Sequence, residues 1–547
     1  MAFEGFTPYD GRSVELYSKR RWWLGLTLGD MFDKACDLYP EREALVGSGN
    51  RYTWSQLRKQ VDRMAYNLIQ EGFEQGDTLL LQLPNWPEFV ISYFALQKAG
   101  LVMVLLTVNH TAKEIAHLCQ LTHPRGWIVP TKYRKTNFLP IIEQVKSENS
   151  NLEKVILVGD DASPDDLKLD DLLISNADPD VIRVALEKAR PDPGDVCQIL
   201  PSGGTTGLPK GAPRTHNDYI CNIEYKSLAW DINPTDACLV VATVGHNLGL
   251  LVCVCGSVFH GAKIVVQDST YPEDFCRTVQ DERITCTGLV PTLISRIVKY
   301  ENLEDFDLTS LKKIYVGAAN SPPELVREVE EKIGARYVNA FGMVEGPLSQ
   351  SRPEDPVEIR FGTIGRPCCP YDDIVTLDEN GNKTAPGVEG ELAAKGPGIF
   401  TGYFNNPQAN QKEFTLDGYF RTGDLATIDE NGCVRITGRI KDIIIRGGEN
   451  IAARDIEDVI STYEKVEYVA AVGMPDADLG EVVCAYIKPA RGVSITHEEV
   501  IDHLQKIEAS RVLFPARIEV VQEMPLTAAG KADKKILKKG IEEKSNK

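Results

Sequence analysis

Helical periodicity is clearest just after residue 53. Thr53 and Gln56 have the spacing of a capping box, in which two side chains satisfy the first free N–H groups of a helix. Apolar residues then recur every three or four positions until Gly72, which is suited to close the helix. The residues of this apolar face are Leu57, Val61, Met64, Ala65 and Leu68. The pattern predicts an amphipathic helix with one buried face.

Short apolar runs alternate with helical patterns over most of the chain. The run at residues 78–83 precedes a helical run at residues 88–98, and the same alternation recurs further on. The later strand-like runs are residues 263–266, 285–290 and 313–316. Alternating strands and helices are typical of α/β domains. We therefore expect a large N-terminal α/β domain.

The pattern changes from about Gly362. Asn380-Gly381 and Asn431-Gly432 are strong hairpin signals, because asparagine and glycine tolerate a positive φ. Several strands joined by such turns predict a β-rich subdomain.

A small terminal unit is expected from about Arg439. Four apolar residues have helical spacing there, and two strand-like runs follow at residues 468–472 and 482–487. The four residues are Ile456, Val459, Ile460 and Tyr463. The expected fold class is thus α/β, with a large multi-subdomain N-terminal α/β domain, a β-rich subdomain and a small α+β C-terminal domain.

Composition and charge exclude several classes of protein. The chain has 547 residues with ordinary globular composition, and 60 Lys+Arg against 79 Asp+Glu give a net charge of −19. Binding to nucleic acid or to an anionic membrane needs a basic surface, so we expect neither. An anionic small-molecule substrate is still compatible, because a local cationic cluster and a metal ion override the overall charge.

The 13 cysteines do not have the spacing of a metal knuckle. We expect them to be buried, reduced thiols. The first residues lack the cationic flank and apolar core of a secretory signal, and no apolar run has the length of a membrane span without interruption. The expected location is the cytoplasm.

The strongest chemical signal is a glycine-rich loop after the apolar stretch at residues 196–200. Its sequence is Ser202-Gly203-Gly204-Thr205-Thr206-Gly207-Leu208-Pro209-Lys210-Gly211. Glycines let backbone N–H groups approach a ligand, the hydroxyls add donors, and Lys210 adds a positive charge. The loop is not a Walker motif, because Pro209 precedes the lysine and Gly211 follows it. It predicts a phosphate-binding loop.

This loop resembles the signature of the adenylate-forming superfamily, which contains acyl-CoA synthetases, aryl-acid AMP ligases, nonribosomal adenylation domains and beetle luciferases. Other segments resemble further motifs of that superfamily, in the same order along the chain. They are Asn339-Ala340-Phe341-Gly342-Met343-Val344-Glu345, residues 419–424, residues 438–442 with 447–451, and residues 525–531. The motifs are most similar to those of 2,3-dihydroxybenzoate-AMP ligases and of aryl or alicyclic acid–CoA ligases.

The resemblance implies that the protein uses ATP and Mg²⁺. Glu345 would anchor the metal, which takes one or two carboxylates together with phosphate oxygens. Lys531 would donate to the attacking carboxylate and to the α-phosphate, and Asp424 would accept the ribose hydroxyls with Arg439 beside it. The other nucleotide contacts would come from Ser202–Lys210 and from Gly317, Ala318, Asn339, Ala340, Phe341 and Gly342.

The resemblance also implies two working states. Residues 1–438 would form the N-terminal adenylation domain, residues 439–442 a hinge, and residues 443–547 a mobile C-terminal domain that carries the catalytic lysine. Lys441 would be the pivot, and a one-residue pivot absorbs a large change in φ and ψ. In the second state a thiol would reach the acyl-adenylate past Gly447 and Gly448.

The acid pocket is expected near Thr243-Val244-Gly245-His246-Asn247, which together with residues 213–219 looks most like the 2,3-dihydroxybenzoate enzymes. His246 would sit beside the carboxylate and Asn247 would face a ring substituent. Val252 stands where that branch has a serine for a catechol hydroxyl, so we expect a compact aromatic or alicyclic acid without the catechol pair. Small residues would leave room for the ring: Gly249, Gly317, Ala318 and Ala340.

Two departures from the family pattern shape the remaining expectations. Val344 replaces the threonine that usually precedes the metal glutamate, as in some aryl-acid AMP ligases. Since the catechol contact is absent, we favour CoA as the thiol acceptor, with a carrier-protein thiol as the alternative. A homodimer is left open.

A light-emitting enzyme on the same scaffold and an inactive binding module are further alternatives. An inactive module should lack Lys531, Glu345 or Asp424, and all three are present.

Overall fold

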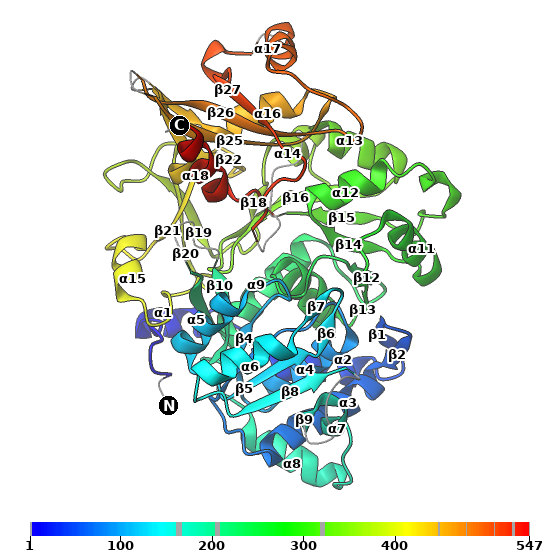
Figure 1. Cartoon of the computed structure of the whole chain (residues 1–547). Coiled ribbons are helices and arrows are strands. Elements are labelled where there is room, and N and C mark those ends of the chain that lie inside the picture. Colours follow the sequence, from blue (N-terminus) through cyan, green and yellow to red (C-terminus); the bar gives the residue numbers. More distant parts are fainter. Residues whose placement is uncertain are drawn as a thin grey trace.

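The computed structural model describes residues 3–159, 167–202, 208–317, 323–446, 449–476, 479–507, 509–527 and 531–545 of the chain. Two large sheets, a four-stranded sheet and a C-terminal sheet account for most of its strands. In Figure 1 the C-terminal sheet lies at the opposite end of the molecule from the sheet that contains β5 and β8. None of the described helices combines the length and the apolar character needed to cross a membrane.

The first large sheet has seven strands in the order β11-β10-β4-β3-β5-β8-β9, and only the β10–β11 pair is antiparallel. The strands are β3 (Thr78–Leu81), β4 (Val102–Leu105), β5 (Gly126–Pro130), β8 (Lys154–Val158), β9 (Leu167–Lys168), β10 (Val196–Ser202) and β11 (Lys210–Thr215). Alternate residues of β3 belong to two cores. Leu80 packs with α5 (Ala112–Thr122) and α6 (Leu139–Glu148), whereas Leu79 and Leu81 pack with α3 (Trp54–Gln70) and α4 (Pro87–Lys98).

The second large sheet has nine strands in the order β18-β17-β16-β15-β14-β12-β13-β1-β2. They are β1 (Glu43–Gly47), β2 (Asn50–Thr53), β12 (Ala237–Val240), β13 (Lys263–Val266), β14 (Cys286–Leu289), β15 (Lys313–Val316), β16 (Arg336–Gly342), β17 (Leu348–Gln350) and β18 (Arg366–Pro367). The core between the two large sheets also contains residues of α2 (Leu28–Leu38), α9 (His216–Ala229) and η1 (Leu248–Cys255). The other face of the second sheet is covered by α11 (Pro272–Glu282), α12 (Pro291–Val298) and α13 (Pro323–Lys332).

Helices surround these sheets and include the predicted amphipathic one. In α3, Thr53 and Gln56 form the capping box, and Leu57, Val61 and Leu68 are fully buried, so that prediction is confirmed. The N-terminal helices are α1 (Gly11–Lys19), α2 (Leu28–Leu38), α3 (Trp54–Gln70), α4 (Pro87–Lys98), α5 (Ala112–Thr122), α6 (Leu139–Glu148), α7 (Leu169–Leu172), α8 (Pro179–Ala189), α9 (His216–Ala229), the π-helix η1 (Leu248–Cys255), α10 (Gly256–His260), α11 (Pro272–Glu282), α12 (Pro291–Val298), the short η2 (Leu303–Asp305), α13 (Pro323–Lys332), α14 (Val357–Gly362) and α15 (Pro407–Glu413).

The β-rich region forms an antiparallel sheet in the order β19-β20-β21-β22. Its strands are β19 (Asp373–Leu377), β20 (Gly390–Lys395), β21 (Phe420–Ile428) and β22 (Val434–Arg439). Asn431-Gly432 lies in the turn between β21 and β22, with Gly432 at φ +75°, as predicted. Asn380-Gly381 also forms a turn, but a longer connection separates β19 from β20.

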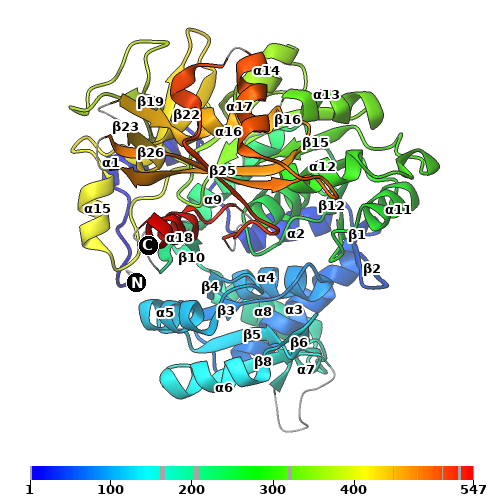
Figure 2. The same cartoon turned by 45° about the horizontal axis from the view of Figure 1, so that its top comes forward.

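The C-terminal region is α+β. Its sheet contains β23 (Ile443–Arg446), β24 (Glu449–Ala452), β25 (Val466–Asp476), β26 (Gly480–Pro489) and β27 (Arg517–Val520). Its helices are α16 (Ala453–Ser461), α17 (His497–Lys506) and α18 (Lys534–Ser545), and α18 packs on the opposite sheet face from the other two. The expected mixed α/β fold, with a large N-terminal and a smaller C-terminal domain, is confirmed (Figure 2).

Two finer expectations need correction. The predicted strands at residues 468–472 and 482–487 are the centres of a much longer hairpin, β25–β26. The helix predicted to include Tyr463 ends at Ser461, so Tyr463 packs on the core from beyond its end.

All 13 cysteines are free and buried, as expected.

Candidate active site

The phosphate-binding loop predicted from the sequence connects β10 to β11. Ser202 and Lys210 are paired across these antiparallel strands, so they flank the two ends of the loop. The residues between these flanks that were expected to bind phosphate, Gly203, Gly204, Thr205, Thr206 and Gly207, lie outside the described part of the chain.

Glu345 lies beside this loop as a buried carboxylate with 2% exposure. Ser202 Oγ and the Tyr403 hydroxyl donate to the same oxygen, Glu345 Oε1, at 2.6 and 2.7 Å. Burial and the Glu345 charge raise the pKa of Tyr403, which therefore stays a neutral donor. The glutamate is thus held in one orientation by its neighbours, and Tyr403 is a contributor that the sequence motifs do not reveal.

Lys210 has an anionic partner that the motif does not show. Its Nζ lies 2.8 Å from both carboxylate oxygens of Glu413, at the end of α15, and 3.7 Å from the centroid of the Tyr403 ring. The Lys210 ammonium therefore contacts both the Glu413 carboxylate and the ring of Tyr403, whose hydroxyl donates to Glu345. A phosphate group at this loop would compete with Glu413 for Lys210.

Asp424 and Arg439 come together through strand pairing. They are opposite each other on β21 and β22, and Arg439 Nε donates to Asp424 Oδ1 at 2.8 Å. Burial opposes the charge on Arg439, but Asp424, and to a smaller extent Glu345, raise its pKa above the ordinary value. Glu345 and the Asp424–Arg439 pair are thus within electrostatic reach of each other.

Lys531, from the C-terminal domain, lies near the Asp424–Arg439 pair. Burial and the Arg439 guanidinium lower the pKa of Lys531 to about 8, against the opposing effect of Asp424. Within the described part of the chain its ammonium group makes no hydrogen bond or ion pair, although its backbone pairs with Thr527. A half-buried cation that forms no ion pair within the described part of the chain is suited to bind an anionic ligand.

The ends of β15 and β16 form another wall. Gly317 follows β15, and a Cβ there would lie 3.3 Å from the Tyr315 ring and 3.6 Å from the Ala340 carbonyl oxygen. Ala340 is buried and Phe341 is half-buried, while the Asn339 amide donates to Thr363 O at 2.8 Å. A Cβ at Gly342 would meet Leu348 at 2.7 Å. Ala318 lies outside the described residues.

The expected acid-pocket residues surround the start of η1. The Tyr219 hydroxyl donates to Asn247 Oδ1 at 2.9 Å, and Asn247 Nδ2 is buried without a hydrogen-bond partner. The half-buried His246 precedes it in a turn in which its N–H donates to Thr243 O. Val252 is buried within the core between the two large sheets. A free amide donor beside an apolar wall is suited to a ring with one acceptor.

Gly249 does not have the role expected of it. A Cβ at this position would lie 2.5 Å from Thr243 O and 2.7 Å from Ala242 O. The glycine therefore allows close contact between the start of η1 and the preceding turn, and it does not leave room for a ring.

A buried ion pair supports the loop that carries Glu345. Arg214 Nε donates to Asp218 Oδ1 at 2.6 Å, and both side chains are at most 1% exposed. The same guanidinium donates to Val344 O and Gly398 O, each at 2.8 Å. Both residues lie in the segment 213–219 that resembles the dihydroxybenzoate enzymes, although the sequence does not indicate this supporting role.

The hinge expected at residues 439–442 coincides with a short 3₁₀ turn, η3 (Ile440–Asp442), between β22 and β23. Lys441 lies in this turn, and the adjacent Asp442 pairs with Lys534 at 3.5 Å. Gly447 and Gly448 lie outside the described residues.

Of the three carboxylates at the site, Asp424 pairs with Arg439 and Glu413 with Lys210, so Glu345 is the one without an ion pair among the described residues. No group of three or more His, Cys, Asp and Glu among the described residues is suited to hold an ion alone. Glu345 therefore fits Mg²⁺ only where phosphate oxygens complete the coordination, which is the usual situation for this ion.

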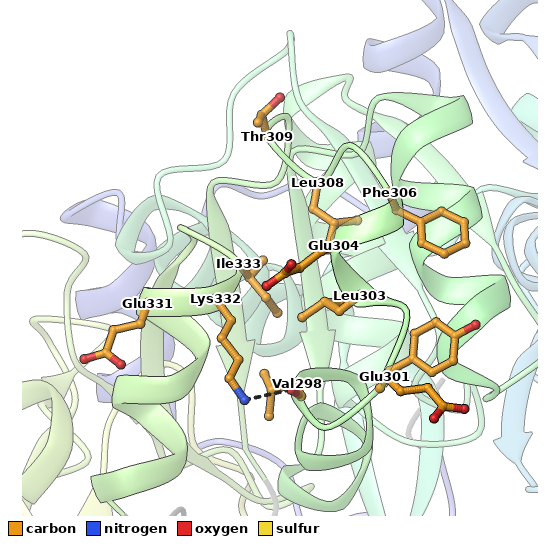
Figure 3. Close-up of a pocket in the computed structure, with 11 residues that line it drawn as sticks. Val298, Glu301, Leu303, Glu304, Phe306, Leu308, Thr309, Glu331, Lys332 and Ile333 are labelled. Carbon is orange, nitrogen blue, oxygen red and sulfur yellow. Dashed lines mark hydrogen bonds between the residues drawn. The ribbon is translucent and has the colours of Figure 1, made fainter.

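A separate cavity of about 440 Å³ lies between the end of α12 with the segment that follows it, residues 298–309, and the end of α13, on the face of the second sheet away from these residues. Figure 3 shows its lining, which mixes glutamates with apolar residues such as Leu303 and Ile333; Lys332 Nζ donates to Val298 O at 3.1 Å. It contains none of the residues expected to be catalytic.

The fold and this constellation define an adenylate-forming enzyme. The chain belongs to the AMP-binding enzyme family, whose model matches residues 32–404, and the AMP-binding enzyme C-terminal domain matches residues 455–531. Over 549 residues it is 33% identical to a salicylyl-CoA synthase / salicylate adenylyltransferase from a Streptomyces species, with 100% of this chain and 99% of the relative covered.

Two further comparisons agree with that family. The 2,3-dihydroxybenzoate-AMP ligase of Bacillus subtilis is 32% identical, covering 99% of this chain and 98% of the relative. The structure of apo MbtA from Mycobacterium smegmatis superposes with a TM-score of 0.75 at 31% identity, with 98% of each chain covered. The predicted superfamily is therefore confirmed.

Proposed function

We propose that this chain is an acid–thiol ligase that activates a small cyclic carboxylate with ATP and then transfers the acyl group to CoA. The observation that carries the proposal is the convergence of Lys531 on the Asp424–Arg439 pair beside Glu345. Two anions must meet for a carboxylate to attack a phosphate, and this convergence supplies positive charge where they would meet.

In the first half-reaction a carboxylate oxygen of the acid forms a bond to the α-phosphorus of ATP, and the bond from that phosphorus to the bridging oxygen breaks. The products are acyl-AMP and pyrophosphate. Lys531 would hold both reacting oxygens, Asp424 would accept the ribose hydroxyls, and Lys210 would neutralise the leaving pyrophosphate after release from Glu413. Mg²⁺, held by Glu345 with phosphate oxygens, would lower the charge of the polyphosphate.

The second half-reaction requires a different face of the C-terminal domain. We propose residues 1–438 as the adenylation domain, 439–442 as the hinge and 443–547 as the mobile domain, with Lys441 as the pivot. Rotation would remove Lys531 and bring Gly447 and Gly448 to the site. A thiolate would then attack the acyl carbon, forming the thioester as the bond to AMP breaks, with His246 beside the reacting carbonyl.

The acid is proposed to be a compact aromatic or alicyclic ring. The names of the relatives include salicylate and 2,3-dihydroxybenzoate, which are hydroxylated benzoates. In this chain the buried Val252 offers no hydrogen bond to a catechol, whereas Asn247 Nδ2 is available to one ring acceptor. Leaving a substrate hydroxyl unpaired against Val252 would cost about 1–3 kcal/mol.

The acceptor thiol is proposed to be that of CoA, with a carrier-protein phosphopantetheine as the second candidate. One relative, named a salicylyl-CoA synthase, supports CoA. Another, named a salicyl-S-ArCP synthetase, from Mycobacterium tuberculosis, supports a carrier protein.

The test is exchange of labelled pyrophosphate into ATP across a panel of ring carboxylates, followed by addition of CoA or of a phosphopantetheinylated carrier protein. We expect acid-dependent exchange with compact rings and a thioester with CoA. Exchange without any CoA thioester, but with loading of the carrier protein, would replace the proposed acceptor. Absence of exchange with every acid would refute the adenylation itself.

A further inference from the structure

One lysine of α9 is fully buried. Lys226 is 1% exposed and lies in the core between the two large sheets. Its Nζ lies 4.1 Å from the centroid of the Tyr315 ring and 3.7 Å from Cys368 Sγ. A thiol is a weak hydrogen-bond acceptor, and an aromatic face stabilises a cation only in part. These two contacts therefore do not offset most of the desolvation free energy of the buried ammonium.

No carboxylate neutralises Lys226 within the described residues. Two other lysines with little exposed side chain show the usual arrangement: the largely covered Lys98 pairs with Asp33 and Asp62, and the buried Lys313 pairs with Asp236. Burial lowers the pKa of Lys226 to about 8, with Cys368 acting in the opposite direction. The contrast with Lys98 and Lys313 indicates that the described part of the chain holds no anionic partner for Lys226.

Further polar groups near Lys226 lack partners. Both side-chain polar atoms of Gln350 are buried without a hydrogen bond, and so is Trp230 Nε1. The Trp230 ring lies 5.5 Å from the Tyr315 ring, and Gln350 is on β17, a strand against which α9 packs. Buried polar atoms are rarely unsatisfied in proteins, so several of them in one region point to a polar ligand or water.

This region adjoins the expected acid pocket. The Tyr315 ring would lie 3.3 Å from a Cβ at Gly317, which is an expected pocket residue. Ala340, another expected pocket residue, is paired with Gln350 across β16 and β17. On α9, Tyr219 donates to Asn247, a residue expected to line the acid pocket, and Lys226 follows seven residues later on the same face. Two helical turns separate them by about 10 Å, which is the scale of a substituted ring with its carboxylate.

We propose that Lys226 is a specificity-determining residue at the inner end of the acid pocket, where its ammonium binds an oxygen substituent on the ring end opposite the reacting carboxylate. The ligand class is a cyclic acid with a hydroxyl, carbonyl or second carboxylate at that end. Gln350 would add a neutral hydrogen bond. The inference rests on the proposed function, since it names a feature of the same substrate.

The test compares matched acids in pyrophosphate exchange: benzoate with 4-hydroxybenzoate, and cyclohexanecarboxylate with 4-oxocyclohexanecarboxylate. The variants are Lys226→Met, which keeps the length without the charge, and Lys226→Gln, which keeps a donor. Lys332→Met, at the remote cavity, is the matched control. The measured quantity is the ratio of kcat/KM between the members of each pair.

We expect the wild type to prefer the oxygen-bearing acid and Lys226→Met to reduce that preference about 10- to 100-fold, mainly by slowing the oxygen-bearing member. Lys226→Gln should retain part of the preference and Lys332→Met all of it. An unchanged ratio in both Lys226 variants, or equal losses for both members, would mean that Lys226 is only structural. Exchange by the wild type with the unsubstituted rings alone would refute this inference but leave the proposed function intact, whereas no exchange with any acid would refute both.

Discussion

At the scale of single residues, the sequence motifs indicate which groups are chemically important but not the state in which they are held. Lys531 was expected from its motif, yet its lowered pKa depends on burial and on Arg439, which is far away in the sequence. Tyr403 and Glu413, which hold Glu345 and Lys210, belong to no motif that we recognised. Such partners are set by tertiary contacts, so only the structure shows them.

The pKa of Lys531 predicts an alkaline limit to acid activation. Lys531 must carry its proton to bind two anions, so kcat/KM for adenylation should fall as the pH rises through about 8. The groups that act on its charge are Arg439, which lowers the pKa, and Asp424, which raises it. The measurement is the pH profile of pyrophosphate exchange.

Lys531→Arg is the matched variant for this profile, because a guanidinium stays charged throughout. Whatever activity it retains should lack the fall near pH 8. If the fall persisted in Lys531→Arg, another group would be responsible for it.

At the scale of elements, much of the fold could be predicted. The capping box and apolar spacing of α3 were sufficient because both are local. Strand lengths were less predictable: β25 and β26 extend beyond their apolar centres, since pairing between two strands continues through residues of any type. The prediction that Gly249 leaves room for a ring was wrong because its close approach to the backbone of residues 242–243 depends on tertiary structure.

The Arg214–Asp218 pair links β11 and α9 to the loop of Glu345, and its removal should destabilise the N-terminal domain. Arg214→Met would leave the Asp218 carboxylate buried without its cation and Val344 O without the Arg214 donor, while Gly398 O would keep only the hydrogen bond from Asn222. The expected loss of unfolding free energy is about 3–5 kcal/mol. Urea or thermal denaturation of the purified variant measures it.

Arg277→Met is the matched control, because Arg277 and Glu273 form an exposed pair with the same four-residue spacing. Its expected cost is below about 1 kcal/mol. Equal stability losses in the two variants would show that the buried pair does not hold this region together.

At the scale of the whole molecule, the sequence could predict an N-terminal and a C-terminal unit but not how they lie against each other. The position of Lys531 beside Asp424 and Arg439 depends on that arrangement. It corresponds to the state that the proposed adenylation step requires. The proposed thiol step requires another arrangement, so the two half-reactions should respond differently to a change at Lys531.

The most direct measurement is therefore the effect of Lys531→Ala on each half-reaction, with Lys539→Ala on the exposed part of α18 as the control. We expect pyrophosphate exchange to fall by about 10²–10³-fold or more, while thioester formation from preformed acyl-AMP and CoA is largely retained. Lys539→Ala should change neither rate. Equal losses in both half-reactions of Lys531→Ala would contradict the central claim that one ammonium group serves acid activation alone.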